Sequence, residues 1–324
     1  MNYIDIAIIG AGFSGMLLAE KLSRHSNVHI FEKSRGIGGR LSTKYTDYGY
    51  FNHGAPYFTA RGKAFKTYLK PFVEKNILNI WKPKIITLEK KRPSYKRLWF
   101  ENHYRTPGHM CDFVRAVYDP KHLHLKSHIV DIKKTKSGHF ELFTADKTCV
   151  ARAKTIINTA PLPQSVKLYE KHAYAQNLDV TAEPRFTLLV VLAEGISFDW
   201  DVAHLKSDIV DSMICENRLN QKSEPTRLVI HSHTGWATKH LEDPKPEVEF
   251  MITKELSGFL NISEKDICWS HLHRWRYQKA FIEKPSMLFL RNSENNLFIV
   301  GDGFGKGRLE DAFESVQACV DHLL

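Results

Sequence analysis

A glycine-rich turn between a short apolar segment and a helix-like segment constrains this chain most. Residues 3–9 are apolar and largely β-branched, as in a buried parallel strand. They lead into Gly-x-Gly-x-x-Gly at residues 10–15 and then into residues 16–22, which have helical spacing. Residues 27–31 predict a second strand, which ends at Glu32. This order predicts a dinucleotide-binding unit of the Rossmann type. A glycine-rich turn in an unrelated α/β protein is the alternative.

Each part of this motif has a physical role. Gly10 permits a tight turn, Gly12 lets the backbone approach a pyrophosphate, and Gly15 lets helix and strand pack closely. The helix N-terminus offers unpaired N–H groups and the positive end of its dipole to phosphates. Glu32 stands where its carboxylate can accept hydrogen bonds from both hydroxyls of a ribose, which disfavours a 2′-phosphate there.

The length of 324 residues predicts one large domain or two intertwined ones. A hydrophobic fraction of 43% excludes disordered and fibrous classes. No apolar run approaches the roughly 18–20 residues needed to cross a bilayer, and the N-terminus lacks the pattern of a cleavable signal. We therefore expect a soluble, cytoplasmic protein without a membrane partner.

The five cysteines lie far apart without a Cys-x-x-Cys pair, which fits a reducing compartment. The net charge of +10 indicates either a solvated basic surface or attraction to acidic partners such as phosphate-bearing small molecules. The densest run of basic residues in the chain, residues 90–97, predicts an exposed loop or hairpin. No nucleic-acid motif surrounds this run, so we expect no nucleic-acid partner.

The C-terminal segment predicts a third part of a cofactor site. Residues 296–300 predict a strand, Gly301 and Asp302 follow it, and residues 309–323 predict a final helix. Asp302 could instead only cap that helix. If both chain ends build one site, the dinucleotide domain is discontinuous.

Residues 36–40, Gly-Ile-Gly-Gly-Arg, follow Glu32 directly and resemble the second dinucleotide motif of FAD-dependent oxidases related to the monoamine oxidases. The resemblance implies FAD as cofactor, with the glycines near its diphosphate and Arg40 near the flavin. In such proteins the Gly-Asp pair binds the ribityl chain, which is the role implied for Asp302. The helix that follows faces the flavin pyrimidine, where negative charge builds on reduction.

Further segments resemble the renalase-like flavoproteins and extend over nearly the whole chain. These segments are residues 40–43, 51–59, 158–164, 228–231, 273–277 and 301–304. Asn52 and Pro56 replace the usual Asp and Gln, and His204 stands where relatives carry a tyrosine. The resemblance implies oxidation of the 2- or 6-dihydro isomers of NAD(P)H to NAD(P)⁺, with oxygen as electron acceptor and hydrogen peroxide as product. The implied partners are thus a dinucleotide substrate and oxygen.

The fold class predicted is α/β, with a Rossmann-type FAD-binding domain of discontinuous chain and an α+β substrate domain with a mixed sheet. The FAD-binding domain is expected at residues 1–73, 100–162 and 288–324, and the substrate domain at 74–99 and 163–287. Within the chain we expect strands at residues 129–131, 140–144, 186–192, 227–231 and 271–275.

Hydride loss makes a dihydropyridine aromatic, so the protein has mainly to stack and position it. We expect His231, Trp275, Thr59 and His204 to line the catalytic pocket over the flavin. The alternative is core packing for Trp275 and a hydrogen-bonded strand histidine for His231. The cofactor contacts expected from the motifs and the resemblance are Gly10, Ala11, Gly12, Phe13, Ser14, Gly15, Glu32, Lys33, Gly39, Arg40, Leu41, His53, Gly54, Ala55, Val130, Ala160, Gly301, Asp302, Arg308, Leu309, Glu310 and Ala312.

The sequence disfavours a metal site and hydrolytic catalysis. The histidine pairs at residues 231/233 and 271/273 share strand faces, but no nearby acid completes a ligand set, so no metal is expected. The chain has no Gly-x-Ser-x-Gly elbow and no Cys/His nucleophile signature, which argues against covalent hydrolysis. An amine oxidase on the same fold, or a flavin-binding protein without turnover, remains as an alternative.

Overall fold

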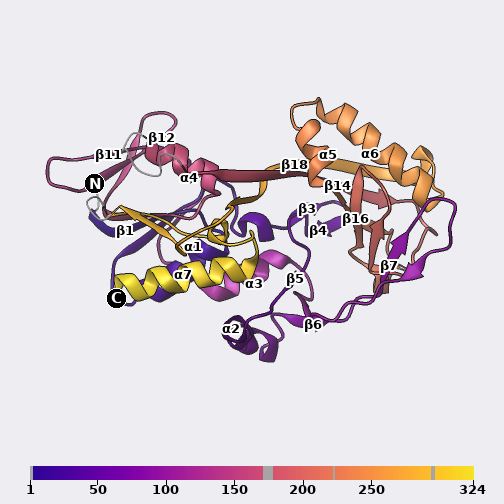
Figure 1. The fold of residues 1–324 in the computed structure, drawn as a ribbon, viewed down its shortest axis with the longest axis horizontal. Coiled ribbons are helices and arrows are strands. Elements are labelled where there is room, and N and C mark those ends of the chain that lie inside the picture. The colour runs from indigo at the N-terminus through magenta and orange to yellow at the C-terminus, as the bar shows by residue number, and fades with distance from the viewer. Residues whose placement is uncertain (1–2, 171–177, 222, 293–295) are drawn as a thin grey trace.

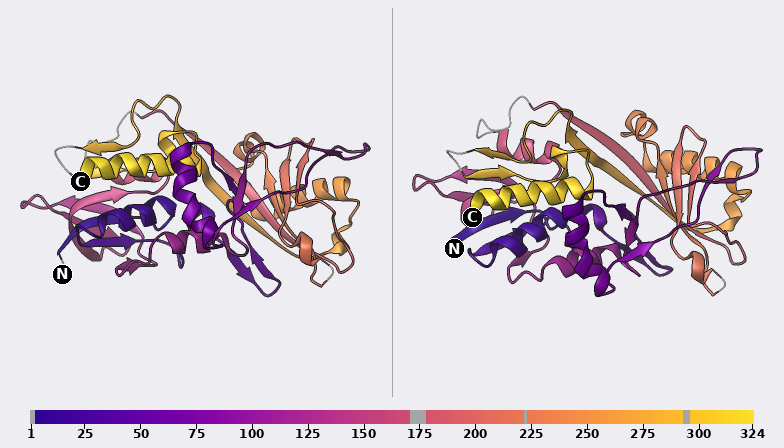
Figure 2. Two further views of the ribbon diagram at one scale, coloured as in Figure 1. Left: turned by 90° about the horizontal axis from the view of Figure 1, so that it is seen from below. Right: turned by 60° about the horizontal axis from the view of Figure 1, so that its bottom comes forward.

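The computed structural model describes residues 3–170, 178–221, 223–292 and 296–324. Two lobes lie side by side along the long axis of the molecule, each built around one large sheet (Figure 1). The N- and C-terminal segments both belong to the same lobe (Figures 1 and 2). The dinucleotide sheet is thus assembled from distant parts of the chain, as the sequence predicts.

The dinucleotide sheet has eight strands, five of them parallel. The parallel strands run in the order β10 (Leu123–His124), β2 (Val28–Phe31), β1 (Tyr3–Ile9), β13 (Cys149–Asn158) and β20 (Leu297–Ile299). Antiparallel strands β11 (Ile129–Lys134), β12 (Phe140–Thr144) and β19 (Leu290–Asn292) extend it. The central strands are apolar and buried because both faces are covered.

Helices cover both faces of this sheet. One face packs against α1 (Phe13–Leu22), α2 (Lys63–Glu74), α3 (Met110–Val117) and α7 (Leu309–Leu323). The other face carries α4 (Leu162–Tyr169), whose Leu162 and Tyr169 join a second apolar cluster. Helices α1 and α7 begin at the carboxyl ends of β1 and β20, so both N-termini lie on one edge of the sheet.

The second sheet is mixed and has seven strands. Its order is β18 (Ile267–Ile282), β14 (Val180–Leu192), β17 (Arg227–Ser232), β16 (Val210–Cys215), β15 (Val202–Leu205), β7 (Ile85–Leu88) and β8 (Tyr95–Lys96). All neighbours are antiparallel except β15 and β7. Helices α5 (Thr234–Lys239) and α6 (Lys245–Leu260) cover one face through an apolar cluster. The long strands β14 and β18 reach from this lobe toward the dinucleotide lobe (Figures 1 and 2).

The remaining elements are short. They are the hairpin β3 (Lys44–Thr46) and β4 (Gly49–Phe51), the small sheet β5 (Phe58–Thr59), β9 (His103–Arg105) and β6 (Asn79–Trp81), and the single turns η1 (Gly39–Leu41), η3 (Arg218–Asn220), η4 (Glu264–Asp266) and η5 (Asp302–Phe304). Within the described residues, no helix is both long enough and apolar enough to cross a bilayer.

The predicted fold class is confirmed: a Rossmann-like sheet is accompanied by a second, mixed sheet. The strand predicted at residues 3–9 and the helix predicted at 309–323 have those bounds in the structure. The basic run at residues 90–97 lies at an exposed hairpin between β7 and β8. The domain boundaries stay a prediction, and residues 1–2, 171–177, 222 and 293–295 of the predicted ranges lie outside the described residues.

Candidate functional site: a cofactor cleft facing a polar sheet wall

A cleft of about 1870 Å³ is lined by residues of both large sheets. Ligand pockets for single small molecules are commonly about 300–1,000 Å³, so this one has room for a dinucleotide and a second ligand. Its dinucleotide side includes the glycine turn after β1, the loop after β2, and the start of α7. Its other side is one face of the second sheet.

Two glycine loops form the floor of the cleft. Gly10 has a φ of +105°, and a Cβ on Gly15 would lie 1.9 Å from the Gly10 carbonyl oxygen, so both positions require glycine. Gly38 donates its N–H to the Ala11 carbonyl over 2.9 Å, which places the second loop against the first. Gly12 faces the cleft, and only the Gly39 Cα lies within 4 Å of where its Cβ would be. The backbone is therefore open to a diphosphate at the N-terminus of α1.

Glu32 is buried at the end of β2 and lines the cleft. Its Oε2 accepts the N–H of Ala11 over 2.8 Å, and its Oε1 accepts the N–H of Ser34 over 2.8 Å. An ionised carboxylate has about four acceptor sites, so two remain for ribose hydroxyls. The backbone contacts fix the carboxylate between the two glycine loops.

Arg40 and Asp302 form a bidentate ion pair. Arg40 Nη1 and Nη2 lie 2.6 Å from the two carboxylate oxygens of Asp302, and Nη1 also donates to the Gln278 carbonyl over 3.1 Å. Burial opposes the charge on Arg40, but the pair with Asp302 outweighs it and raises the arginine pKa. The pair links the loop after β2, the turn after β20 and strand β18.

Most of the predicted cofactor contacts line the cleft. The predicted residues that line it are Gly10, Gly12, Phe13, Ser14, Glu32, Lys33, Gly39, Arg40, Leu41, His53, Gly54, Ala55, Val130, Ala160, Asp302, Arg308, Leu309 and Ala312. Val130 lies at an irregularity of the β11–β12 ladder, where the register passes from Ile129 to Asp131.

Four predicted contacts do not line the cleft: Ala11, Gly15, Gly301 and Glu310. The Glu310 carboxylate instead accepts the backbone N–H groups of Arg61 and Gly62, next to the start of α2. Gly15 packs against Gly10, and the N–H of Gly301 donates to Ser315 over 2.9 Å. These residues shape the cleft from behind, and motif spacing alone does not distinguish a lining residue from a supporting one.

The opposite wall is a polar row that runs straight across the second sheet. Cross-strand pairs join His273 to Thr187, Thr187 to His231, His231 to Ser212, and Ser212 to His204. All five line the cleft. The next positions on the same face are apolar, for example Leu189, Val229 and Ile214, which pack around Phe51. The face thus changes from apolar to polar where the cleft begins.

Three buried polar atoms in this wall have no hydrogen-bond partner: Arg185 Nε, Thr187 Oγ1 and His231 Nε2. Arg185 and Thr187 lie two residues apart on β14, and Thr187 is opposite His231. Burial, aided by the nearby Arg185, lowers the pKa of His231 well below its usual value, so its imidazole is neutral. Buried polar atoms in native proteins are normally paired, so these three are unsatisfied polar groups beside the cleft.

Trp275 stands beside this wall on β18, opposite Arg185. It is partly exposed and lines the cleft, so it is not a core residue. Its Nε1 donates to the His53 carbonyl over 3.2 Å, and its ring stacks on the His53 ring at 5.3 Å. Burial, followed by the charges of His273 and Lys44, lowers the pKa of His53 to about 3. The indole is held in place by an uncharged histidine.

Thr59 and His204 also line the cleft, so the structure brings all four predicted catalytic residues to one cavity. Thr59 lies on β5 on the dinucleotide side, and His204 lies at the far end of the polar row. Burial, then Arg97, lowers the pKa of His204.

Two of the three departures from the renalase-like pattern, Asn52 and Pro56, differ in their relation to the cleft. Asn52 is fully buried away from the cleft, where its Nδ2 donates to Gly108 and Glu216 and its Oδ1 accepts from Met110 and Thr43. Pro56 lines the cleft.

Sequence reasoning missed Arg185, Thr187, Asp211 and Ser212, which the structure places in the cleft wall. The sequence does contain a signal for Arg185 and Thr187, because they alternate along the strand with the buried apolar residues Phe186 and Leu188. For Asp211 and Ser212 the sequence gives no comparable pattern.

Comparison with known proteins supports this architecture. Residues 8–72 match the NAD(P)-binding Rossmann-like domain family. The two-lobed fold as a whole is similar to that of several solved structures. A protein from Exiguobacterium sp. 255-15 assigned as a protoporphyrinogen oxidase superposes with a TM-score of 0.74 at 10% identity, over 100% of this chain and 99% of that one. Putrescine oxidase bound to putrescine superposes with a TM-score of 0.69 at 11% identity, over 99% of each chain. A putrescine oxidase variant from a cofactor-binding redesign superposes with a TM-score of 0.70 at 11% identity, over 99% of this chain and 98% of that one. At these identities the likeness concerns the fold.

Proposed function

We propose that this chain is an FAD-dependent oxidase of the renalase-like type, which oxidises 2- or 6-dihydro isomers of NAD(P)H to NAD(P)⁺ with oxygen as acceptor. The glycine floor, Glu32 and the Arg40–Asp302 pair fit an FAD in the dinucleotide half of the cleft. The chemistry that FAD supplies when bound is acceptance of a hydride and transfer of two electrons to oxygen, which yields hydrogen peroxide.

The polar wall is the observation that carries the choice of substrate. A nicotinamide ring bears a carboxamide, which both donates and accepts hydrogen bonds. Thr187 Oγ1 and the neutral His231 can do either, and Arg185 donates. These three groups would satisfy a carboxamide, while Trp275 supplies an aromatic surface for its ring.

An amine oxidase is the alternative, and the fold likeness to putrescine oxidase favours it. A neutral amine would need an apolar, aromatic-walled pocket, whereas this wall holds unpartnered polar atoms and the Arg185 guanidinium. A flavin-binding protein without turnover is the third reading.

The test begins with the cofactor. The purified protein should be yellow and release FAD, not FMN, on denaturation, and a colourless protein that takes up no FAD would refute the proposal. Anaerobic flavin reduction is then measured with dihydronicotinamide isomers and with a panel of amines.

The pH dependence separates the two substrate classes. Hydride transfer from a dihydropyridine needs no general base, and His231 stays neutral because its pKa lies well below 6.5. The reduction rate should therefore be nearly flat from about pH 6 to 9. Amine oxidation would rise steeply over this range because most amines are protonated below about pH 9–10. Amine-dependent reduction with that rise, without reduction by dihydronicotinamides, would establish the amine oxidase.

A further inference from the structure

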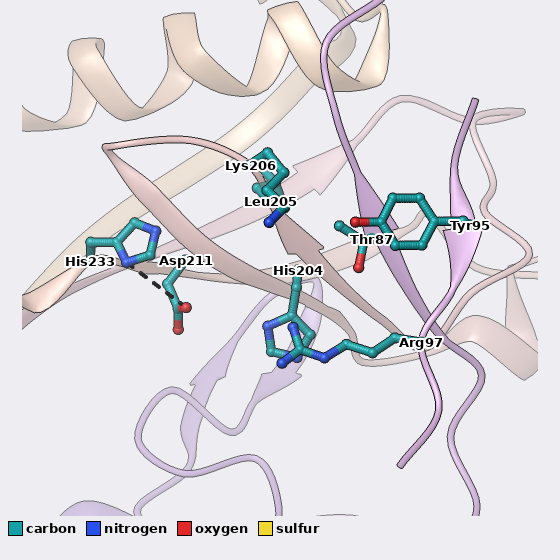
Figure 3. A pocket seen from close by; sticks show the side chains of 8 residues that line it. All are labelled: Thr87, Tyr95, Arg97, His204, Leu205, Lys206, Asp211 and His233. Atoms are coloured by element: carbon teal, nitrogen blue, oxygen red, sulfur yellow. Dashed lines mark ion pairs between the residues drawn. The ribbon is translucent and has the colours of Figure 1, made fainter. Parts of the chain in front are cut away.

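A side pocket of about 390 Å³ adjoins the cleft at the end of the polar row (Figure 3). His204 and Asp211 line both cavities. The row itself continues into the pocket, since His204 pairs with Thr87 and Thr87 pairs with Tyr95. The other lining residues are Arg97, Leu205, Lys206 and His233. The polar row that starts beside Trp275 therefore leads along the sheet face into this pocket.

The pocket has an excess of positive charge. Arg97 and Lys206 line it as exposed side chains, and neither forms an ion pair within the part of the chain that the structure describes. The acid in the pocket, Asp211, is already shared: Arg185 Nη2 lies 3.5 Å from its Oδ2, and His233 Nδ1 lies 4.0 Å from its Oδ1. Two cations thus remain without a counter-charge, so an anion suits the pocket.

The wall beside Arg97 is flat and aromatic. The rings of Trp99 and His204 stack nearly parallel, with centroids 6.4 Å apart, and the Arg97 guanidinium lies 5.7 Å from the Trp99 centroid. Arg97 and His204 both line the side pocket, and their side chains overlap in the view of Figure 3. A guanidinium held in this way offers a planar set of donors to phosphate oxygens.

We propose that the side pocket is a phosphoryl subsite, in which Arg97 and Lys206 bind a phosphate of the substrate whose reacting ring lies beside Trp275. This proposal deepens the proposed function, and it rests on that function for the position of the dihydronicotinamide ring beside Trp275. The phosphate would be either the diphosphate of the dinucleotide or a 2′-phosphate on its adenosine. A diamine is disfavoured because its distal ammonium would meet Arg97 and Lys206, and the Asp211 carboxylate already has two partners.

The kinetic test uses Arg97→Gln and Lys206→Gln with three dihydronicotinamide substrates: the riboside, the NAD isomer and the NADP isomer. Arg92→Gln is the matched control, because Arg92 lies in the same hairpin, lines neither cavity and pairs with Glu89 at 3.1 Å. Each pocket variant should raise KM for the phosphate-bearing substrate about five- to tenfold, with kcat and the riboside KM unchanged. An increase for both dinucleotides identifies the diphosphate, and an increase for the NADP isomer alone identifies the 2′-phosphate. Unchanged KM values for both dinucleotides would overturn the subsite.

A binding measurement keeps this result separate from the proposed function. Inorganic pyrophosphate is titrated by calorimetry into the FAD-loaded protein, where the cofactor already fills its own diphosphate site. Wild type and Arg92→Gln should bind it, and both pocket variants should bind more weakly by about five- to tenfold. If no dihydronicotinamide reduces the flavin but this pattern holds, the substrate assignment fails and the phosphoryl subsite stands. The subsite is refuted if pyrophosphate does not bind, or if it binds equally to the wild type, Arg92→Gln, Arg97→Gln and Lys206→Gln. It is also refuted if putrescine binds and Asp211→Asn abolishes that binding.

Discussion

Asn52 donates both its backbone N–H and its side-chain amide to the two carboxylate oxygens of Glu216, over 3.0 and 3.2 Å. Both side chains are buried, and Arg105 completes the group at 3.1 Å from Glu216. An aspartate at position 52, the residue expected from the renalase-like pattern, would place a second carboxylate against Glu216. The amide at this position is therefore explained by its buried acidic partner, and it has no contact with the cleft.

Asn52→Asp should accordingly lower the free energy of unfolding at pH 7 by about 3 kcal/mol or more, because it removes two donors and adds an unpaired buried charge. Urea unfolding measures this loss, with the exposed Asn79→Asp as control. Adding Glu216→Gln should recover at least about 1 kcal/mol relative to the sum of the single changes, since the two carboxylates no longer repel. Additive effects would contradict the proposed repulsion.

Replacing Glu32 should weaken FAD binding. Glu32→Ala removes the acceptor proposed for the ribose hydroxyls and also frees the N–H groups of Ala11 and Ser34. Hydrogen bonds to charged groups are worth about 1.5–3 kcal/mol, so affinity should fall by about ten- to a hundredfold. Fluorescence titration of the apoprotein with FAD measures this, and the spectrum of the flavin that still binds should stay normal. Unchanged affinity would mean that Glu32 only braces the loops.

Trp275 should govern flavin reduction without governing FAD retention. Trp275→Ala removes the surface on which the substrate ring is proposed to stack, and aromatic pairs contribute about 0.5–1.5 kcal/mol beyond area burial. Stopped-flow reduction should slow by about three- to tenfold, with FAD content unchanged. Trp275→Phe keeps an aromatic face but loses the Nε1–H bond to the His53 carbonyl. Its rate of flavin reduction should therefore lie between those of the wild type and Trp275→Ala. Loss of FAD in Trp275→Ala would indicate a structural role instead.

His53 should make the protein acid-sensitive. Its pKa is about 3 in the fold and about 6.5 when exposed, so the unfolded chain binds more protons between these values. Its contribution to stability is therefore complete above pH 6.5 and is lost as pH falls toward 3, by up to about 1.4 kcal/mol per pH unit. His53→Phe should make the free energy of unfolding less dependent on pH between 4 and 6.5 in urea titrations. An unchanged slope would mean that His53 is protonated in the fold.

The conformations of the glycine motif could be predicted because they are local. A positive φ at Gly10, or a close approach at Gly15, follows from a few consecutive residues, and their spacing records it. The same holds for the strands and helices around them, whose apolar patterns reflect burial on one face or both.

Sequence by itself thus determined the fold class, the dinucleotide unit and the residues that form its floor. Tertiary structure alone decided that Glu310 supports α2 from behind the cleft, and that Thr187, His231, Ser212 and His204 form one row. That row depends on the register between strands far apart in the chain, and a shift of one residue would turn each side chain to the other face. Pairing of this kind is set by the packing of the whole sheet, which no local pattern encodes.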